Sequence, residues 1–282
     1  MTDSASIPGA AGQGVQAHCR GYTGLTIETL LAYKTLAVGV WIALFLLAER
    51  LRPMAVVPAE AKGLARLGRN GGLWLLNAVL SPLLVIPVSL WASQHTLGWR
   101  MPEWQGGWFL LLDLLLLDFL IYWWHRANHE LPLLWRFHEV HHLDRFLDAS
   151  SALRFHFGEV LLSAGFRALV IILLDIPLAS VLVFEALVLM ASVFHHSNLR
   201  LPAGLEKFLA RLVVTPSIHW VHHHAVRRNT DSNYATILSL WDRLFGSRSA
   251  TRRTPDLPIG LEGVGRDDDI RALLMRPFRT RP

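Results

Sequence analysis

Charged residues are scarce in this chain, and cysteine is almost absent. Asp, Glu, Lys and Arg make up 17% of its 282 residues, whereas roughly a quarter of the residues in soluble proteins are charged. The single cysteine, Cys19, excludes an intrachain disulfide framework and a thiolate metal site. The basic residues form no stripe interleaved with aromatic residues, which argues against a nucleic-acid partner. With 52% hydrophobic residues, the composition is that of an integral membrane protein.

The N-terminal residues lack the features of a cleavable signal peptide. Residues 1–25 are rich in Gly, Ala and Ser and have neither a charged segment nor an early apolar core. We expect them to form a flexible tail. Residues 26–248 are expected to form one membrane-embedded domain, and residues 249–282 a C-terminal cytoplasmic tail.

Long apolar stretches occur in four places. Residues 29–48, 73–91 and 107–124 are each long enough to span a bilayer as a helix. Residues 160–194 form a longer stretch that Asp175-Ile176-Pro177 interrupts, which predicts two helices joined by a tight turn. The expected fold is all-α, with about four to five apolar helices: three spans and a helical hairpin that spans or enters the bilayer.

Loop charge predicts how these spans are oriented. Basic residues concentrate in the cytoplasmic loops of membrane proteins. The loop between the second and third spans carries only Arg100. The segment between the first and second spans carries Arg50, Arg52, Lys62, Arg66 and Arg69. The third span is therefore expected to end in the cytoplasm, where residues 125–159 and those after about 196 would form a helical cap.

Ionisable side chains within the apolar stretches should face protein or a cavity, because contact with lipid is costly. Arg167 and Glu185 lie inside the hairpin, and Asp118 shares one stripe of the third span with His125. Two roles remain open for Asp118. It accepts a hydrogen bond from a ligating imidazole, or it pairs with another helix, for example through Arg167.

Ten of the fourteen histidines fall into four short clusters, each beside an apolar stretch. The clusters lie at 125–129, 138–142, 195–196 and 219–223. Imidazole is the commonest metal-ligating side chain near neutral pH, and one ion needs three or four protein ligands. Nine or ten candidate ligands therefore predict two metal ions. Their position predicts that these ions work at a membrane surface, on a molecule that resides in the membrane.

The spacing within the clusters is that of one helix face. Residues three and four apart share a face, as His125 and His129 do. The two H-x-x-H-H triplets at 138–142 and 219–223 have the same property. Each cluster is therefore expected to direct two or three imidazoles into one space. Thr215-Pro216 has the form of an N-cap followed by a first-turn proline, which predicts a helix carrying the second triplet.

Two other functions use the same residues. Residues 138–142 (HEVHH) match the H-E-x-x-H motif of zinc proteases, in which the glutamate acts as base. Such a site needs one further ligand and leaves six or seven clustered histidines unexplained. A membrane metal transporter would need polar residues along several spans, whereas these histidines gather at one end of spans rich in Leu, Val and Ala. The pattern favours an enzyme with two metals.

Seven motifs in residues 70–248 resemble the fatty acid hydroxylase superfamily and, within it, the bacterial sterol desaturase family. They are 118–129 (DFLIYWWHRANH), 134–142 (LWRFHEVHH), 154–159 (RFHFGE), 194–198 (FHHSN), 216–223 (PSIHWVHH), 233–234 (NY) and 241–246 (WDRLFG). Family members often have H-P-x-E where this chain has HFGE, without the proline. The order and spacing of the motifs carry the resemblance.

The resemblance implies a non-haem di-iron oxygenase of a bacterial inner membrane, with two Fe²⁺ ions on the cytoplasmic side. It would hydroxylate or desaturate a lipid such as a sterol, a fatty acyl or a sphingoid chain. Electrons would come from an external ferredoxin, cytochrome or reductase. The family's His-Ser-Asn element favours His196 over His195 as a ligand. The metal ligands would be His125, His129, His138, His141, His142, His196, His219, His222 and His223. Supporting residues would be Asp118, His156, Glu159, His195, Asn198, Asn233 and Asp242.

Overall fold

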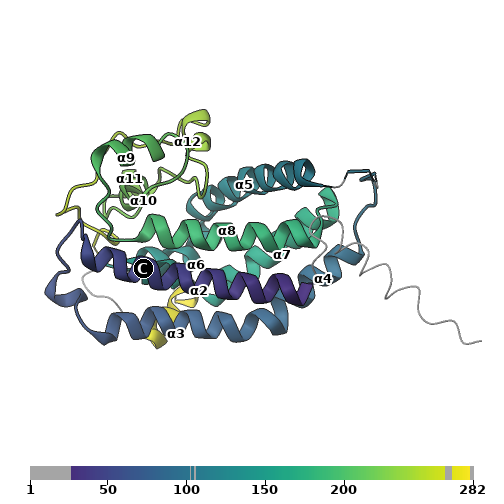
Figure 1. Cartoon of the computed structure of the whole chain (residues 1–282). Helices are drawn as coiled ribbons and strands as arrows, with labels where there is room; N and C mark the ends of the chain where they lie inside the picture. Colours follow the sequence, from purple (N-terminus) through teal and green to yellow (C-terminus); the bar gives the residue numbers. More distant parts are fainter. Residues whose placement is uncertain (1–26, 102, 105, 264–268, 280–282) are drawn as a thin grey trace, which may run out of the picture.

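The computed structural model describes residues 27–101, 103–104, 106–263 and 269–279. Within these ranges the chain is helical, and its only β-type pairings are isolated bridges. Figure 1 shows long helices lying lengthwise beside one another, with short helices gathered near one end. This confirms the all-α fold. The expected N-terminal tail, residues 1–25, lies outside the described residues.

Five helical segments are long and apolar enough to cross a membrane, so the chain is a multi-pass membrane protein. The first is α2 (Ile27–Leu51). The second joins α3 (Leu64–Leu80), the π-helical turn η2 (Ser81–Val85) and α4 (Ile86–Gln94). The others are α5 (Gly107–Glu130), α7 (Phe157–Leu174) and α8 (Leu178–His196). The three predicted spans and the hairpin are all present.

Local sequence explains both irregularities in these segments. Proline lacks a backbone N–H donor and crowds the preceding helical turn, and Pro82 lies in the π-helical turn that links α3 to α4. The hairpin turns where it was expected, because Asp175 adopts a left-handed conformation with φ 52° and ends α7. Pro177 then serves as the N-cap of α8.

Helix α8 lies at the centre of the bundle. It packs against α2, α5 and the short helix η3 (Ala149–Leu153). Trp41 of α2 donates a hydrogen bond from Nε1 to the carbonyl of Met190 on α8, at 2.8 Å. Helix α2 leaves Leu36, Val40 and Leu44 exposed. Because they recur every four residues, they form an apolar stripe facing outward, as contact with lipid requires.

The short helices form a cap around the histidine-bearing end of the bundle (Figure 1). They are η1 (Ala59–Ala61), α6 (Pro132–His142), η3, α9 (Ala203–Leu209), α10 (Pro216–His222), α11 (Arg227–Thr230) and α12 (Leu240–Leu244). Helix α10 begins at Pro216 after Thr215, as expected, although the Thr215 side chain makes no capping hydrogen bond.

A buried ion-pair network joins the cap to α3. Arg66 donates to Asp144 at 2.8 Å and also pairs with Asp148, and Arg66 and Asp144 are both buried. Burial alone would raise the pKa of Asp144, but the charges of Arg66 and Arg154 outweigh it and hold that pKa well below its ordinary value. Arg66 was counted as a loop cation in the orientation prediction, yet it lies in α3 and fastens the cap.

The described part of the expected C-terminal tail packs against the cap and α3. Leu273 of α13 (Ile270–Met275) is fully buried against Leu73 and Val140. Arg276, at the start of η4 (Arg276–Phe278), donates from Nε to Glu139 Oε1 at 3.2 Å. These residues cover the outer face of α6. The division of the chain at residues 25 and 248 stays a prediction.

Candidate metal centre

Nine histidines converge in two groups at the capped end of the bundle. Within each group, one nitrogen of every imidazole lies within 4.8 Å of the others. The five-histidine group consists of His125, His129, His138, His142 and His222. The four-histidine group consists of His141, His196, His219 and His223. These are the nine residues that the sequence predicts as ligands, and the structure brings all of them together.

Helices α6 and α10 each contribute to both groups, which the sequence analysis did not anticipate. His138 and His142 of α6 enter the five-histidine group, whereas His141 enters the four-histidine group. Helix α10 and its C-cap divide the other way, with His222 in the first group and His219 and His223 in the second. Adjacent residues on a helix point about 100° apart. The two neighbouring histidines of each triplet therefore face different spaces instead of one.

Within each group, imidazole nitrogens of different histidines lie close to one another. His138 Nε2 lies 3.2 Å from His125 Nε2 and 3.2 Å from His142 Nε2. In the other group, His196 Nε2 lies 3.0 Å from both His141 Nε2 and His219 Nε2. Two nitrogens bound to one ion at roughly 2.1 Å and at right angles would be about 3 Å apart. The spacing therefore fits ligands of a shared ion.

Burial keeps these imidazoles neutral. His222 is fully buried, and removal from water, together with the neighbouring His138 and His196, lowers its pKa to about 3. Burial also lowers the pKa values of His141, His142, His219 and His223 well below the ordinary value, again with further lowering by neighbouring histidines. A neutral imidazole keeps a lone pair available, and a metal ligand needs that lone pair.

The outer nitrogens of six imidazoles are held by hydrogen bonds, which orient the rings. The backbone carbonyls of Tyr234 and Arg154 accept hydrogen bonds from Nδ1 of His125 and His141, at 2.8 and 3.1 Å. Those of Ser192 and Ser232 accept from Nδ1 of His196 and His222, at 2.8 and 2.6 Å. Carboxylates face the remaining two: Glu159 at 2.8 Å from His138 Nδ1 and Asp231 at 3.3 Å from His129 Nδ1. Such partners fix the tautomer and direct the opposite nitrogen toward a metal.

Two buried nitrogens provide a direct test of the fit to a metal. His129 Nε2 and His222 Nε2 have no hydrogen-bond partner among the described residues, although their Nδ1 atoms face Asp231 and Ser232. A buried polar atom without a partner costs free energy. A metal ion would satisfy both nitrogens, and a set of neutral imidazoles without thiolate is a donor set that iron accepts. The residues present therefore fit a metal.

Two of the predicted supporting residues lie at the histidine groups. Glu159 contacts His138, as described above. The ring centre of His195 lies 3.8 Å from that of His219, and neither of its ring nitrogens has a hydrogen-bond partner among the described residues. His195 belongs to neither group, and His196 occupies the ligand position that the resemblance favoured.

The other predicted supporting residues hold the cap together at a distance from the imidazoles. Asp118 accepts hydrogen bonds from the backbone of Ile237 and Leu238 and from Trp241 Nε1, so its partner is neither a histidine nor Arg167. His156 caps α7 by accepting from the backbone N–H of Gly158, and its Nε2 bonds to the carbonyl of Leu274.

Three polar residues of the predicted set stabilise loops. Asn198 exchanges two hydrogen bonds with the backbone of Ala55. Asn233, in a left-handed conformation with φ 53°, donates to the carbonyl of Ile218 on α10. Asp242 accepts from Ser247 Oγ at 2.7 Å and from the backbone of Ala235. Each fixes a segment that carries or borders a histidine.

Sequence reasoning missed Asp231 and the four backbone carbonyls. Asp231 follows the last histidine cluster by several residues, and no spacing rule connects it to His129 on α5. A carbonyl that orients an imidazole leaves no trace in residue type, because every residue has one.

The glutamate of the H-E-x-x-H motif does not face the histidine groups. Glu139 is buried and accepts from Arg276 Nε at 3.2 Å, and it is not a member of either group. A protease would need this carboxylate beside the metal as its base. The zinc-protease interpretation therefore gains no support from the geometry.

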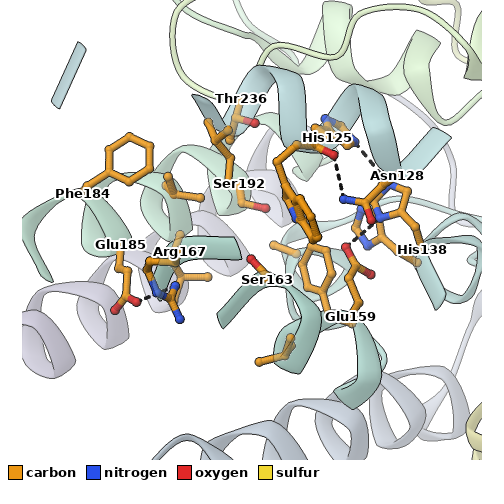
Figure 2. Close-up of a pocket in the computed structure, with 18 of the residues that line it drawn as sticks. His125, Asn128, His138, Glu159, Ser163, Arg167, Phe184, Glu185, Ser192 and Thr236 are labelled. Atoms are coloured by element: carbon orange, nitrogen blue, oxygen red, sulfur yellow. Dashed lines mark hydrogen bonds and ion pairs between the residues drawn. The ribbon is translucent and has the colours of Figure 1, made fainter. Parts of the chain in front are cut away.

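An apolar cavity of about 400 Å³ adjoins the histidines, between α3, α5, α7 and α8. Histidines of both groups line it, among them His125, His138, His141 and His196. Figure 2 shows His125 and His138 on one side and Arg167 with Glu185 on the other. The rest of the lining is mostly apolar, and includes Leu117, Leu120, Ile121, Trp124, Phe166, Val170, Val181, Phe184 and Val188. Arg167 and Glu185 thus face a cavity, as the sequence predicted.

Comparison with known proteins identifies a family for the part of the chain that carries the histidines. The family model of fatty acid hydroxylases matches residues 110–247, which carry all nine histidines of the two groups. Residues 110–247 form a fatty acid hydroxylase domain. Helices α6 to α8, all of α5 except its first three residues, and most of the cap lie inside this domain, whereas α2, α3 and α4 precede it.

Relatives of the fatty acid hydroxylase domain are lipid hydroxylases and monooxygenases. Ornithine lipid hydroxylase OlsE of Rhizobium tropici is 30% identical over 69% of this chain and 58% of its own length. Alkylglycerol monooxygenase of Danio rerio is 34% identical over 57% of this chain and 34% of its own. Cholesterol 25-hydroxylase of Rattus norvegicus is 29% identical over 54% and 51%. The chain thus spans between about a third and three fifths of these relatives. No solved structure matches it significantly.

Proposed function

We propose that the chain is a membrane-bound di-iron oxygenase that inserts oxygen into a C–H bond of a lipid. The observation that carries this proposal is the position of two histidine groups at one side of an apolar cavity between membrane helices. The relatives are named for the hydroxylation or monooxygenation of lipids, which favours hydroxylation over desaturation.

The five-histidine and four-histidine groups would each hold one iron ion. Imidazole suits ferrous iron, and a site with open positions lets O₂ reach the metal. When bound, the two ions would supply the reduction of O₂ and the oxidising power needed to attack an unactivated C–H bond. Hydrogen bonds that the imidazoles donate to Glu159, Asp231 and the backbone carbonyls would keep the rings in the tautomers that bind metal.

The chain itself would bind and orient the lipid and exclude water. Phe166, Val170, Phe184 and Val188 provide apolar contacts along the cavity, so a hydrocarbon chain gains from leaving water. Burial of eight of the nine histidines beneath the cap keeps bulk water from the reacting carbon. The protein thus positions the lipid and excludes water, while the metals would supply the oxidation chemistry.

Electrons for the reaction would come from a separate protein, such as a ferredoxin, a cytochrome or a reductase. The sequence contains no dinucleotide-binding fingerprint and no cysteine cluster. The cap carries exposed arginines, among them Arg211, Arg228, Arg243 and Arg248. A positively charged surface of this kind would attract an acidic electron-donor protein. Basic residues near the histidine end also favour a cytoplasmic orientation of the cap, in a bacterial inner membrane.

The test is to purify the protein anaerobically with iron, count the metals and follow lipid products in cells. We expect two irons per chain and an oxygen-dependent hydroxylated lipid that disappears in His141→Ala. The matched control is His95→Ala, because His95 is exposed and contacts Trp91 at the end of α4, outside both groups. Full product formation by the His141→Ala protein, or by wild type with fewer than two irons, would refute the proposal.

A further inference from the structure

Three ionisable side chains meet at the part of the apolar cavity that lies away from the histidines. Glu185 of α8 accepts from Arg167 Nη1 of α7 at 2.7 Å and also pairs with Lys34 Nζ of α2. Arg167 and Glu185 line the cavity, and Figure 2 shows them together. Glu185 precedes His196 on α8 by three helical turns, which is roughly 16 Å along the axis.

The cluster carries one positive charge more than pairing alone requires. One cation would neutralise Glu185, yet both Arg167 and Lys34 contact it. All three residues lie in helices that are long and apolar enough to span a membrane, where an unneutralised charge is expensive and marks a functional site by default. Arg167 Nε is buried and has no hydrogen-bond partner among the described residues. A guanidinium with a donor to spare can bind an oxygen acceptor.

A second ion pair, between the loop residue Arg100 and Asp113 of α5, shows what a purely structural pair looks like in this chain. Arg100 donates from Nη1 and Nη2 to the two carboxylate oxygens of Asp113, at 3.1 and 2.6 Å. Asp113 also accepts from Ser180 Oγ at 2.7 Å. Neither Arg100 nor Asp113 lines the cavity. The Lys34–Glu185–Arg167 cluster differs in facing the cavity and in having excess positive charge.

We propose that the Lys34–Glu185–Arg167 cluster recognises the polar end of the substrate, an inference that rests on the proposed function. The substrate class is an elongated lipid that carries a compact oxygen acceptor at one end: a hydroxyl, a carbonyl or a carboxylate. That oxygen accepts a hydrogen bond from Arg167, while the apolar body lies along Phe166, Val188 and Leu189 toward the histidines. Oxygen insertion then occurs far from the recognised polar group.

The experiment measures binding of three ligands of equal length, hexadecanol, hexadecanoate and hexadecane, to the purified full chain in lipid nanodiscs. Each competes with a brominated alkane that quenches the fluorescence of Trp124, which lines the cavity and stacks on Phe166 at 4.7 Å. Loss of the quenching signal in Trp124→Phe identifies the site. We expect one or both oxygen-bearing ligands to bind about ten- to hundredfold more tightly than hexadecane, as hydrogen bonds to charged groups allow.

The preferred ligand distinguishes the sources of the oxygen. Tighter binding of hexadecanoate supports recognition of a carboxylate, and tighter binding of hexadecanol supports recognition of a hydroxyl. Equal binding of all three ligands overturns the inference.

Two variants separate recognition from structural pairing. Arg167→Met should remove the preference for the oxygen-bearing ligands and leave hexadecane binding unchanged. Glu185→Gln keeps the shape of the side chain and raises the net charge of the cluster from one to two, so it should strengthen hexadecanoate binding relative to hexadecanol. The control Arg100→Met should leave every ratio unchanged. Equal loss of all three ligands in Arg167→Met, or no change in the ratio in Glu185→Gln, contradicts recognition.

Failure of this inference can be distinguished from failure of the proposed function. Selective binding without any oxygen-dependent product would refute the oxygenase and leave the recognition site intact. An oxygen-dependent product formed by a protein that binds the three ligands equally would do the reverse.

Discussion

The five-histidine and four-histidine groups differ in what holds the outer nitrogens of their imidazoles. Two carboxylates, Glu159 and Asp231, face His138 and His129 of the five-histidine group. In the four-histidine group, the partners of His141 and His196 are the backbone carbonyls of Arg154 and Ser192. Among the described residues, one group therefore has anionic partners, and the other has neutral ones.

Because of this difference, the two groups are expected to bind metal with unequal affinity. A carboxylate that accepts from a ligating imidazole makes the imidazole a stronger donor. The five-histidine group also offers one more nitrogen. We therefore expect it to bind iron more tightly and to release it more slowly to a chelator than the four-histidine group.

The largest effect is expected from removing a ligand in one group at a time. His138→Ala and His219→Ala should each reduce the iron content of the purified chain from two ions toward one. The loss of affinity should exceed the roughly 10- to 100-fold loss that follows removal of an outer partner. Elemental analysis together with the O₂-dependent product checks both variants. Two irons retained in either variant would show that its group is not a separate site.

Glu159→Gln should weaken metal binding in the five-histidine group alone, by about 10- to 100-fold, because an amide is a neutral partner for His138. Competition with a chelator measures the two affinities. Ser192→Ala is the matched control, since it removes only a neutral partner of His196 Nδ1, the Ser192 hydroxyl at 3.2 Å, and retains the backbone carbonyl at 2.8 Å. If both variants weakened metal binding equally, the carboxylate would not account for the difference between the groups.

Acid should destabilise the metal-free protein through both groups at once. Burial first, and neighbouring histidines second, lower the pKa of His222 to about 3, and the pKa values of His141, His142, His219 and His223 also fall. In the unfolded chain these histidines take up protons near pH 6.5. The unfolded state therefore binds more protons below that pH, and the stability present at neutral pH is lost as the pH falls.

Thermal unfolding of the metal-free protein at several pH values between about 7.5 and 5 checks this prediction. The unfolding temperature should decrease steadily across the range. An unchanged or rising unfolding temperature on acidification would mean that the imidazoles are not buried in neutral form.

The smallest effect is expected from a charge that lies beside the five-histidine group without contacting it. Arg126 follows His125 on α5 and pairs with Glu130 at 2.7 Å, in an exposed i,i+4 arrangement. Such pairs contribute about 0.3–0.5 kcal/mol. Arg126→Ala should leave the iron content and the two metal affinities unchanged, as measured by the same chelator competition. A selective loss of iron would extend the five-histidine group to its charged neighbours.

Much of the fold could be predicted from the sequence because membrane-spanning helices appear in it as long apolar runs. Asp175 and Pro177 marked the turn between α7 and α8, and the histidine spacing indicated the ligand-bearing face of α5. The expectation of one face for each triplet was wrong, because α6 and α10 present histidines to both groups. The nine predicted ligands coincide with the nine histidines that the structure brings together, and their binding of metal stays a prediction.

Other features could not be predicted because they depend on tertiary contacts. Arg66 looked like a loop cation, but its pairing with Asp144 required knowing that α3 packs against the cap. Residues 249–282 were expected to form a C-terminal tail, yet Leu273 is fully buried. The orienting carbonyls of Arg154, Ser192, Ser232 and Tyr234 leave no signal in the identity of those residues.

Helices α6 and α10 each carry histidines of both groups, on adjacent positions of a rigid backbone. The backbone of each helix therefore sets the separation between the two groups, and no bridging molecule is needed to set it. If each group holds one ion, the backbone of α6 and α10 would fix how far apart the two ions lie. Electron sharing between the two ions would then require little movement of the protein.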